Sequence, residues 1–271
     1  MPNDDELPEP LRLTQTADSV FTAPRDEERE ARGYPVYGGQ LLGQMIMAGG
    51  AGGDKAVQSI HAVFARAGSY AEPLEYHVDR MHDGRSFASS TVTCRQGDRL
   101  VARGLLLLTV PDPHFLDFQR LVATSDVPTG PGVPDSRLFP GSLAVAPSEA
   151  DASGQLSLWT RHPDPVRSPL ANQAMLAWGT DGYLIAAALG PHPGIDESQA
   201  HDTISTGVVS HSVSFHGPVD MSQWILLAHE HVIARNGRAF GRCSVFAAGG
   251  EHIASFSQDA MVRPRTGRGP L

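Results

Sequence analysis

Two polar residues stand in apolar surroundings in the second half of the chain, and both types can take part in chemistry. Asp181 falls on the apolar stripe of a helix predicted from about residue 173 to 189, where an unpaired carboxylate is costly. Gln258 falls within a strand pattern, and a buried amide there must be hydrogen-bonded, with a water molecule or a substrate carbonyl as candidate partners. The alternatives are a helix carboxylate satisfied by a neighbouring group and a merely structural glutamine.

An internal repeat allows these two positions to be compared with a second copy of the same unit. Six residues recur 153 positions later: Gly84, Arg85, Phe87, Val92, Gly97 and Pro111 return as Gly237, Arg238, Phe240, Val245, Gly250 and Pro264. At this spacing Gln258 corresponds to Leu105, and an alignment of Gln40 with Gln173 places Ala48 opposite Asp181. A polar residue that faces an apolar one in the other copy favours a functional explanation over a structural one.

Each copy is predicted to contain one helix followed by antiparallel strands. Residues 41–49 have helical spacing, and strands are expected at 60–65, 74–80, 86–94 and 100–109. In the second copy a helix at 173–189 precedes strands at 207–215, 223–233, 239–247 and 252–262. The fold class is therefore α+β, with two helix-wrapped sheets that we expect to join into one continuous sheet with pseudo-twofold symmetry.

The domain boundaries follow from this pattern. We expect an acidic N-terminal segment (1–30), a first module (31–111), a linker (112–169), a second module that carries the candidate site (170–264) and a tail (265–271). The linker is rich in Pro, Gly, Ser and Asp, and within it only residues 155–160 have a strand pattern.

Composition excludes several functional classes. The formal net charge of the 271 residues is -9 with no basic run, which argues against a nucleic-acid surface. The first 30 residues lack the basic-then-apolar order of a secretion signal, and no apolar run approaches the ~18 residues of a membrane span, so a cytoplasmic location is expected. Cys94 and Cys243 do not correspond between the copies, so no shared disulfide or thiolate metal framework is expected.

Sequence motifs for metals and cofactors are incomplete in this chain. His229 and His231 lie on one face of a predicted strand, but no third metal ligand is evident. The chain has no Gly-x-Ser-x-Gly elbow, and glycines 49–53 precede Asp54-Lys55-Ala56 where a phosphate-binding P-loop needs Gly-Lys-Ser/Thr. No metal and no cofactor are expected.

Several ordered motifs resemble one enzyme family. Residues 36–44 (VYGGQLLGQ), 59–68 (SIHAVFARAG) and 83–87 (DGRSF) resemble the N-terminal half of the type II (TesB-like) acyl-CoA thioesterases, which are double-hotdog proteins. Residues 177–181 (AWGTD), 211–216 (HSVSFH) and 257–263 (SQDAMVR) follow the order and spacing of its C-terminal half. The resemblance covers most of residues 33–110 and 171–263.

The resemblance implies hydrolysis of acyl-CoA thioesters in lipid metabolism, without a cofactor. The family holds an activated water with an Asp, a Gln and a Thr of the C-terminal hotdog. Asp181 and Gln258 match the first two, and Asp181 would act as general base toward the water.

The third position departs from the family pattern, because the family Thr falls on Val208, which has no hydroxyl group. Strand alternation places Thr206 and Ser210 on the same face as Val208, so either hydroxyl could serve. His211 matches the family, whereas Ser210 replaces a family Asp.

Substrate-binding candidates complete the predicted site, and two other functions remain open. Gly39, Gln40 and His211 are candidates for contacts with the substrate, and Arg66, Arg238 and Arg242 for the CoA phosphates. One alternative is a hotdog hydratase of enoyl thioesters that uses Asp181 with His211. The other is a non-catalytic acyl-CoA or acyl-chain binder, in which Val208 marks a lost water site. A homo-oligomer is also expected.

Overall fold

The computed structural model describes residues 7–113, 115–119, 126–145, 153–200 and 202–265 of the chain. Of the predicted tail, residues 266–271 lie outside the described residues, as do residues 1–6 of the predicted acidic segment. The chain divides into two compact units, one of residues 1–113 and 166–178 and the other of residues 114–165 and 179–271. The two units are described separately.

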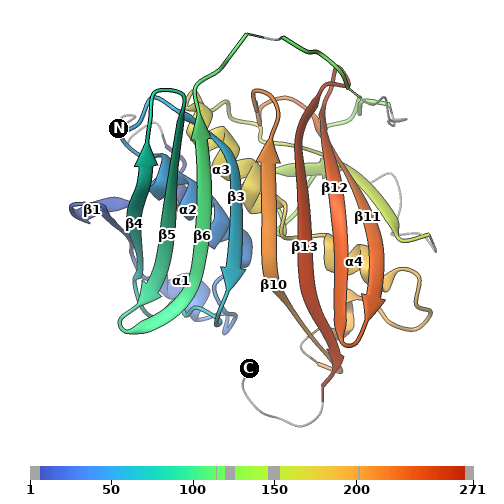
Figure 1. Cartoon of the computed structure of the whole chain (residues 1–271). Coiled ribbons are helices and arrows are strands. Elements are labelled where there is room, and N and C mark those ends of the chain that lie inside the picture. Colours follow the sequence, from blue (N-terminus) through green and yellow to red (C-terminus); the bar gives the residue numbers. More distant parts are fainter. Residues whose placement is uncertain (1–6, 114, 120–125, 146–152, 201, 266–271) are drawn as a thin grey trace. The chain divides into compact units, whose positions relative to one another are not determined.

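The first unit contains an antiparallel sheet in the order β1-β2-β4-β5-β6-β3. Its strands are β1 (Thr14–Ala17), β2 (Val20–Ala23), β3 (Ala56–Phe64), β4 (Leu74–Asp83), β5 (Phe87–Gln96) and β6 (Arg99–Thr109). Its helical segments are η2 (Glu9–Leu11), α1 (Glu27–Glu30), α2 (Gly38–Gly50) and α3 (Pro169–Gly179), which belongs to this unit through Trp178. The α2 helix packs against β3, β4, β5 and β6, which run in front of it in Figure 1.

The second unit contains an antiparallel sheet in the order β10-β13-β12-β11-β9-β8-β7. Its strands are β7 (Val133–Pro134), β8 (Leu143–Val145), β9 (Gln155–Arg161), β10 (Ile204–Phe215), β11 (Ile225–Arg235), β12 (Arg238–Ala247) and β13 (His252–Pro264). Its helical segments are α4 (Leu184–Leu189) and η3 (Glu197–Gln199). The α4 helix packs against β11 and β12, as Figure 1 shows.

The predicted meander of each copy is confirmed, and the structure adds strands that the pattern did not indicate. The eight expected strands correspond to β3–β6 and β10–β13, and residues 155–160 form most of β9. The Asn236-Gly237 turn between β11 and β12 has φ values of 55° and 69°, as a two-residue hairpin turn requires. The added strands β1, β2, β7 and β8 are two to four residues long, too short for alternation to be recognised.

The repeat spacing of 153 is wrong as a structural register, because the strand pairings of the two copies correspond at spacings of 151 and 152 residues. Each copy has a β-bulge in its first long strand, at Gln58 between Val57 and Ser59 and at Val209 between Val208 and Ser210. These bulges are 151 positions apart. The β12–β13 turn is one residue longer than the β5–β6 turn, so the last strands correspond at 152 positions.

The corrected register changes the counterpart of Gln258. Because side chains alternate between the two faces of a strand, a shift of one position reverses the face. Leu105 is 50% exposed on the outer face of β6, and the inward counterpart of Gln258 is the buried Leu106. The inference that the first copy has an apolar residue at this place still holds.

Helices α2 and α3 approach each other closely in the first unit because glycines line the contact. A Cβ atom added at Gly39 would lie 2.1 Å from the carbonyl oxygen of Trp178, and one at Gly43 would lie 3.0 Å from the carbonyl oxygen of Ala174. Gln173 also donates a hydrogen bond of 2.7 Å from Nε2 to the carbonyl oxygen of Val57. These contacts fix α3, whose C-terminal end leads to Asp181.

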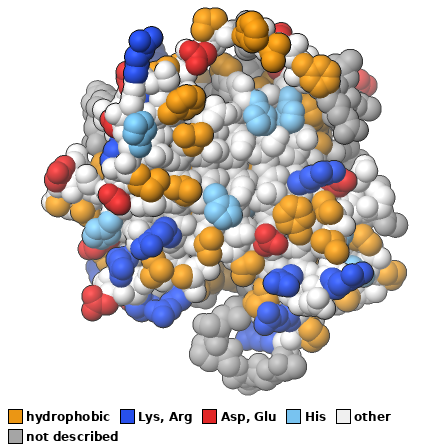
Figure 2. Space-filling model, viewed as in Figure 1, with side chains coloured by type: hydrophobic (Ala, Val, Ile, Leu, Met, Phe, Trp, Pro, Cys, Tyr) orange, Lys and Arg blue, Asp and Glu red, His pale blue; other side chains and the backbone are white. Residues whose placement is uncertain are grey.

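The faces of the sheets seen in Figure 1 are not purely polar. Figure 2 shows hydrophobic side chains among charged ones on this side. The exposed apolar side chains of the first unit include Val63 (49% exposed), Phe87 (52%) and Leu105 (50%). Exposed apolar side chains of adjacent strands are typical of surfaces that another molecule covers.

Candidate active site

Asp181 lies in a turn between two helices. The prediction of one continuous helix from 173 to 189 is wrong: α3 ends at Gly179, and α4 begins at Leu184. Glycines at 179 and 182 weaken the helix at this point. The side chain of Thr180 is fully buried, and Asp181 is 8% exposed. The turn therefore presents a carboxylate on a short irregular segment of backbone.

The turn is held at both ends by hydrogen bonds within the second unit. At its start, Oγ1 of Thr180 lies 2.8 Å from Nε2 of His211 on β10. At its end, the hydroxyl group of Tyr183 donates to the carboxylate of Asp135. Asp181 lies between these two anchored residues, so the position of its backbone is fixed.

Asp135 belongs to a charged cluster that supports the end of the turn. Arg137 donates to both oxygens of Asp135, at 3.1 and 2.9 Å, and its guanidinium lies 4.1 Å from the ring centroid of Tyr183. Arg137 also pairs with Glu197 at 2.9 Å. Burial alone would raise the pKa of Asp135, but the hydrogen bonds from Arg137 and Tyr183 lower it. Asp135 is therefore a carboxylate that accepts these bonds.

Gln258 lies on the inward face of β13, with 2% of its surface exposed. Its backbone is paired with His211 on β10 and with Gly241 on β12. The side-chain atoms Oε1 and Nε2 are both buried, and neither has a hydrogen-bond partner among the described residues. An unsatisfied buried polar group costs about 1–3 kcal/mol.

Both neighbours of Gln258 connect it to the turn that carries Asp181. On one side, His211 is the partner of Thr180. On the other side, a Cβ atom added at Gly241 would lie 2.8 Å from Cδ2 of Leu184, the first residue of α4. Thr180 and Leu184 lie on either side of residues 181–183, and each contacts a strand residue that is paired with Gln258. The turn therefore lies over the part of the sheet that contains Gln258.

The structure does not place the two predicted replacement hydroxyls beside Gln258. The expectation that Ser210 shares a face with Val208 is wrong, because the bulge at Val209 turns Ser210 to the opposite face. There its hydroxyl donates to Asp259 at 3.1 Å. Thr206 is buried on the inward face, but it pairs with Val262, about 13 Å along β13 from Gln258 at 3.3 Å per residue.

A hydroxyl group that the sequence reasoning did not assign lies closer to the candidate site. Thr180 immediately precedes Asp181, and it contacts His211, the strand partner of Gln258. Its place next to Asp181 in the sequence is the signal that could have identified it. Val208 faces inward opposite Ala260, so the family hydroxyl has no equivalent at that position.

The predicted substrate-binding residues are distributed over both units. In the first unit Gly39 and Gln40 lie at the start of α2, and Oε1 of Gln40 accepts hydrogen bonds from Arg29 (2.8 Å) and Tyr70 (3.1 Å). Arg66 in the first unit and Arg238 in the second are exposed. Arg242 is exposed too, and its Nε pairs with Glu230 at 2.8 Å.

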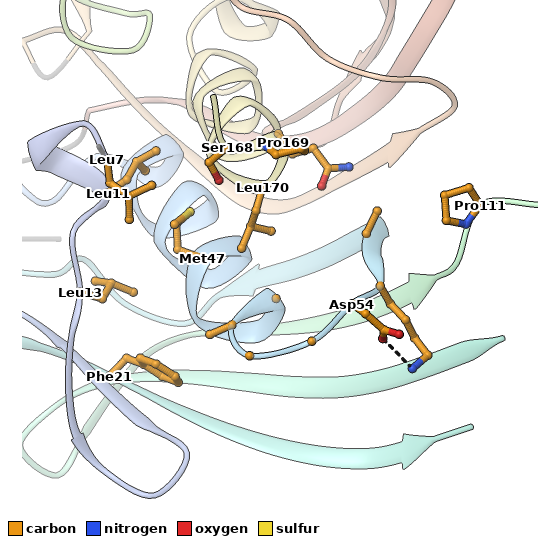
Figure 3. Close-up of a pocket in the computed structure, with 17 residues that line it drawn as sticks. Leu7, Leu11, Leu13, Phe21, Met47, Asp54, Pro111, Ser168, Pro169 and Leu170 are labelled. Atoms are coloured by element: carbon orange, nitrogen blue, oxygen red, sulfur yellow. Dashed lines mark hydrogen bonds and ion pairs between the residues drawn. The ribbon is translucent and has the colours of Figure 1, made fainter. Parts of the chain in front are cut away.

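The first unit contains a pocket of about 640 Å³, shown in Figure 3. Apolar side chains of the N-terminal segment line it together with the end of α2 and the start of α3, among them Leu7, Leu11, Phe21, Met47 and Leu170. At its edge Lys55 pairs with Asp54 (3.4 Å) and Asp83 (3.1 Å). Asp181 and Gln258 do not line this pocket.

Two sequence-based expectations about metals and membranes can be compared with the described residues. His229 and His231 both pair with inward positions of β12, so they share a face as predicted. Within the described part of the chain, no group of three His, Cys, Asp or Glu side chains could hold a metal ion. Among the helices described here, none has the length and apolar character needed to cross a membrane.

The fold defines a class of protein. Over 97% of this chain and 98% of the other, it resembles the acyl-CoA thioesterase II TesB2 of Mycobacterium marinum, with a TM-score of 0.79 and 23% identity. A conserved hot dog fold protein of Alicyclobacillus acidocaldarius gives a TM-score of 0.75 with 14% identity, over 95% and 98% of the two chains. These similarities show the hotdog fold, which confirms the predicted α+β class.

The sequence identifies the family. Residues 26–109 match the acyl-CoA thioesterase N-terminal domain, and residues 111–262 match the acyl-CoA thioesterase C-terminal domain. The chain therefore belongs to the acyl-CoA thioesterase family. It is also 25% identical to acyl-CoA thioesterase 2 of Haemophilus influenzae, over 93% of this chain and 95% of that protein.

Proposed function

We propose that this chain hydrolyses acyl-CoA thioesters with a water molecule held between Asp181 and Gln258. The observation that carries the proposal is the amide of Gln258, which is buried and has no hydrogen-bond partner among the described residues. In the first unit the corresponding residue is Leu106, so the fold itself does not require an amide there.

The chemistry needs only these groups and the substrate. Asp181 takes a proton from the water, whose oxygen attacks the thioester carbonyl while Gln258 orients it. The tetrahedral intermediate then expels the CoA thiolate as the carbon–sulfur bond breaks, and the proton passes from Asp181 to the sulfur. The products are a free acid and CoA, and Asp181 is again ionised.

Thr180 is proposed to take the place of the hydroxyl group that Val208 lacks. Its Oγ1 contacts His211, whose backbone pairs with that of Gln258. A hydroxyl that donates to an imidazole nitrogen can still accept a hydrogen bond from water. Of the two hydroxyls that the sequence predicts for this role, Thr206 lies further along the strand and Ser210 lies on the opposite face.

Substrate contacts are assigned by resemblance and by chemistry. Gly39 and Gln40 are assigned to substrate contacts by the resemblance alone, because the backbone N–H of Gln40 already donates to the carbonyl oxygen of Tyr37 at 3.1 Å. Arg66 and Arg238 are exposed and suit the CoA phosphates. Arg242 would have to exchange its pairing with Glu230 for a phosphate.

The cellular setting of the reaction is proposed on more general grounds. Acyl-CoA hydrolysis would place the chain in lipid metabolism. Exposed apolar side chains of the first unit, such as Val63, Phe87 and Leu105, support a homo-oligomer.

Thiol release from acyl-CoA tests the proposal directly. We expect the wild-type chain to release CoA from medium or long acyl-CoA, and Asp181→Asn to lower kcat at least ~100-fold because the base is lost. Thr180→Val is expected to lower kcat about tenfold or more. Ser210→Ala is the matched control, because this hydroxyl faces away from Gln258, and it should retain full activity.

A second candidate function rests on Val208. Because this residue has no hydroxyl, the chain could bind acyl-CoA without turning it over. Calorimetric titration with acyl-CoA beside the thiol assay separates the two functions. Micromolar binding without thiol release, unchanged in Asp181→Asn, would replace the hydrolase by an acyl-CoA-binding protein.

A further inference from the structure

Three inward positions of the second sheet are polar where the first sheet is apolar. In the structural register His211 corresponds to Ile60, Gln258 to Leu106 and His229 to Val78. His211 contacts Thr180, and Gln258 belongs to the proposed site. The mechanism proposed above does not use His229, which therefore needs a separate explanation.

The hydrogen bonding of His229 defines its protonation state. The ring is 2% exposed, and Nδ1 lies 3.1 Å from the carbonyl oxygen of Leu156. Because a carbonyl oxygen only accepts hydrogen bonds, Nδ1 carries the proton. Burial lowers the pKa of His229 to about 4, so the ring is neutral at pH 7. Its Nε2 is then a pure acceptor.

Nε2 of His229 is buried and has no hydrogen-bond partner among the described residues. The rings nearest to His229 are those of Tyr183 (5.5 Å between centroids) and Phe256 (5.6 Å). The hydroxyl of Tyr183 donates to Asp135, and Sγ of Cys243, on the paired position of β12, donates to the carbonyl oxygen of Ser244 at 3.5 Å. The hydroxyl of Tyr183 and the thiol of Cys243 are therefore both engaged with other acceptors.

We propose that Nε2 of His229 accepts a hydrogen bond from a hydroxyl group on the acyl chain, so that hydroxyacyl thioesters are substrates of this site. The inference rests on the proposed function and specifies its substrate class. The acyl chain would follow the seam between α4 and strands β11 and β12, which are in contact. In this seam His229 offers an acceptor to a chain that otherwise meets Phe256 and Leu184.

The sheet register gives the position of the hydroxyl group along the chain. Gln258 pairs with Gly241, which pairs with His231, and His229 lies two residues further along β11. With strands about 4.8 Å apart and 3.3 Å per residue, the Cα atoms of Gln258 and His229 are about 12 Å apart. Because an extended alkyl chain is a zigzag that advances only about 1.25 Å per carbon–carbon bond, that span corresponds to about nine to ten bonds. A terminal hydroxyl of a medium chain fits, and a β-hydroxyl does not.

The test compares ω-hydroxydecanoyl-CoA with decanoyl-CoA. For the wild type we expect kcat/KM to be about three- to tenfold higher for the hydroxylated substrate, the effect of one neutral hydrogen bond. In His229→Leu the ratio should fall to one or below. His229→Gln keeps an acceptor of similar reach and should retain part of the preference. His61→Leu, the same substitution at an exposed histidine of the first unit, should leave the ratio unchanged.

Two further measurements separate this proposal from the proposed function. β-Hydroxydecanoyl-CoA should show no His229-dependent preference. Calorimetric titration of both decanoyl substrates into Asp181→Asn measures binding without turnover. If both substrates are hydrolysed and the ratio of their kcat/KM values is the same in the wild type and in His229→Leu, the proposed role of His229 is wrong, because water alone would then satisfy Nε2. Preferential binding without hydrolysis in the wild type would overturn the hydrolase and leave the role of His229 supported.

Discussion

Replacement of Gln258 by leucine should stabilise the protein and inactivate it. The change gives β13 the residue that β6 has at the corresponding position, Leu106. It removes two buried amide atoms that have no partner among the described residues. The one water of the proposed site satisfies one of them, and the atom left unsatisfied costs about 1–3 kcal/mol. We therefore expect the free energy of unfolding to rise by about 2 kcal/mol. For a chain of this size, that corresponds to an increase in Tm of about 4–8 °C.

Activity should change in the opposite direction. Loss of a positioned hydrogen-bonding group at a reaction centre lowers kcat by about 10²–10³-fold. Urea unfolding followed by circular dichroism gives the stability, and thiol release from decanoyl-CoA gives kcat and KM on the same preparation.

The reverse substitution in the first unit is the matched control. Leu106→Gln places an amide in a buried apolar site, so it should destabilise the protein by about 3 kcal/mol while kcat per folded molecule is unchanged. If Gln258→Leu lowers stability, the amide is satisfied within the protein and is structural. If the variant remains fully active, Gln258 does not hold the attacking water, and the proposed mechanism is wrong.

Three further predictions concern other parts of the chain. Gly39→Ala should lower the free energy of unfolding measured in urea by about 1–3 kcal/mol, because the new Cβ atom would lie 2.1 Å from a carbonyl oxygen of α3. Gly53→Ala is the control: its new Cβ atom has no neighbour closer than 3.9 Å, so stability should hardly change. The pKa of His229 is about 4 in the folded state, against an ordinary value of 6.5, so between these pH values the unfolded state binds more protons than the folded state. The free energy of unfolding should therefore rise with pH from 4 to 6.5, by up to about 3 kcal/mol. If the same rise with pH is measured for His229→Leu, this assignment is wrong. Tyr183→Phe removes the hydrogen bond to Asp135 and should lower kcat about tenfold with little change in KM, and equal kcat values would show that the bond does not position the turn.

The elements of the fold could be predicted well from the sequence because they depend on local periodicity. The α2 helix and the strands of both meanders follow the apolar spacing, and Asn236-Gly237 is a turn signal that the backbone requires. The break between α3 and α4 was not predicted, because the apolar pattern continues across Thr180 and Asp181 although the backbone does not. Glycines 179 and 182 were the available signal.

For the candidate site, the sequence predicts which residue types take part but not how all of their side chains are arranged. Asp181 and Gln258 were recognised because polar side chains in apolar patterns require an explanation, and both are buried. Strict alternation predicts the correct face for Thr206 and the wrong face for Ser210, because the β-bulge between Val208 and Ser210 leaves no trace in the sequence pattern. Thr180 was not assigned a role because its partner, His211, lies 31 positions away in the sequence.

The bulge at Val209 is a single unpaired residue, yet it decides the orientation of everything that follows it on β10. Deletion of that one residue would restore strict alternation and would have to be absorbed by a rotation of half the strand. Either His211, Val213 and Phe215 would turn toward solvent, or the segment before the bulge would do so. The duplicated bulge at Gln58 subjects the other copy to the same constraint. Insertions and deletions should therefore be tolerated at the hairpin ends of these strands and rejected in their middle.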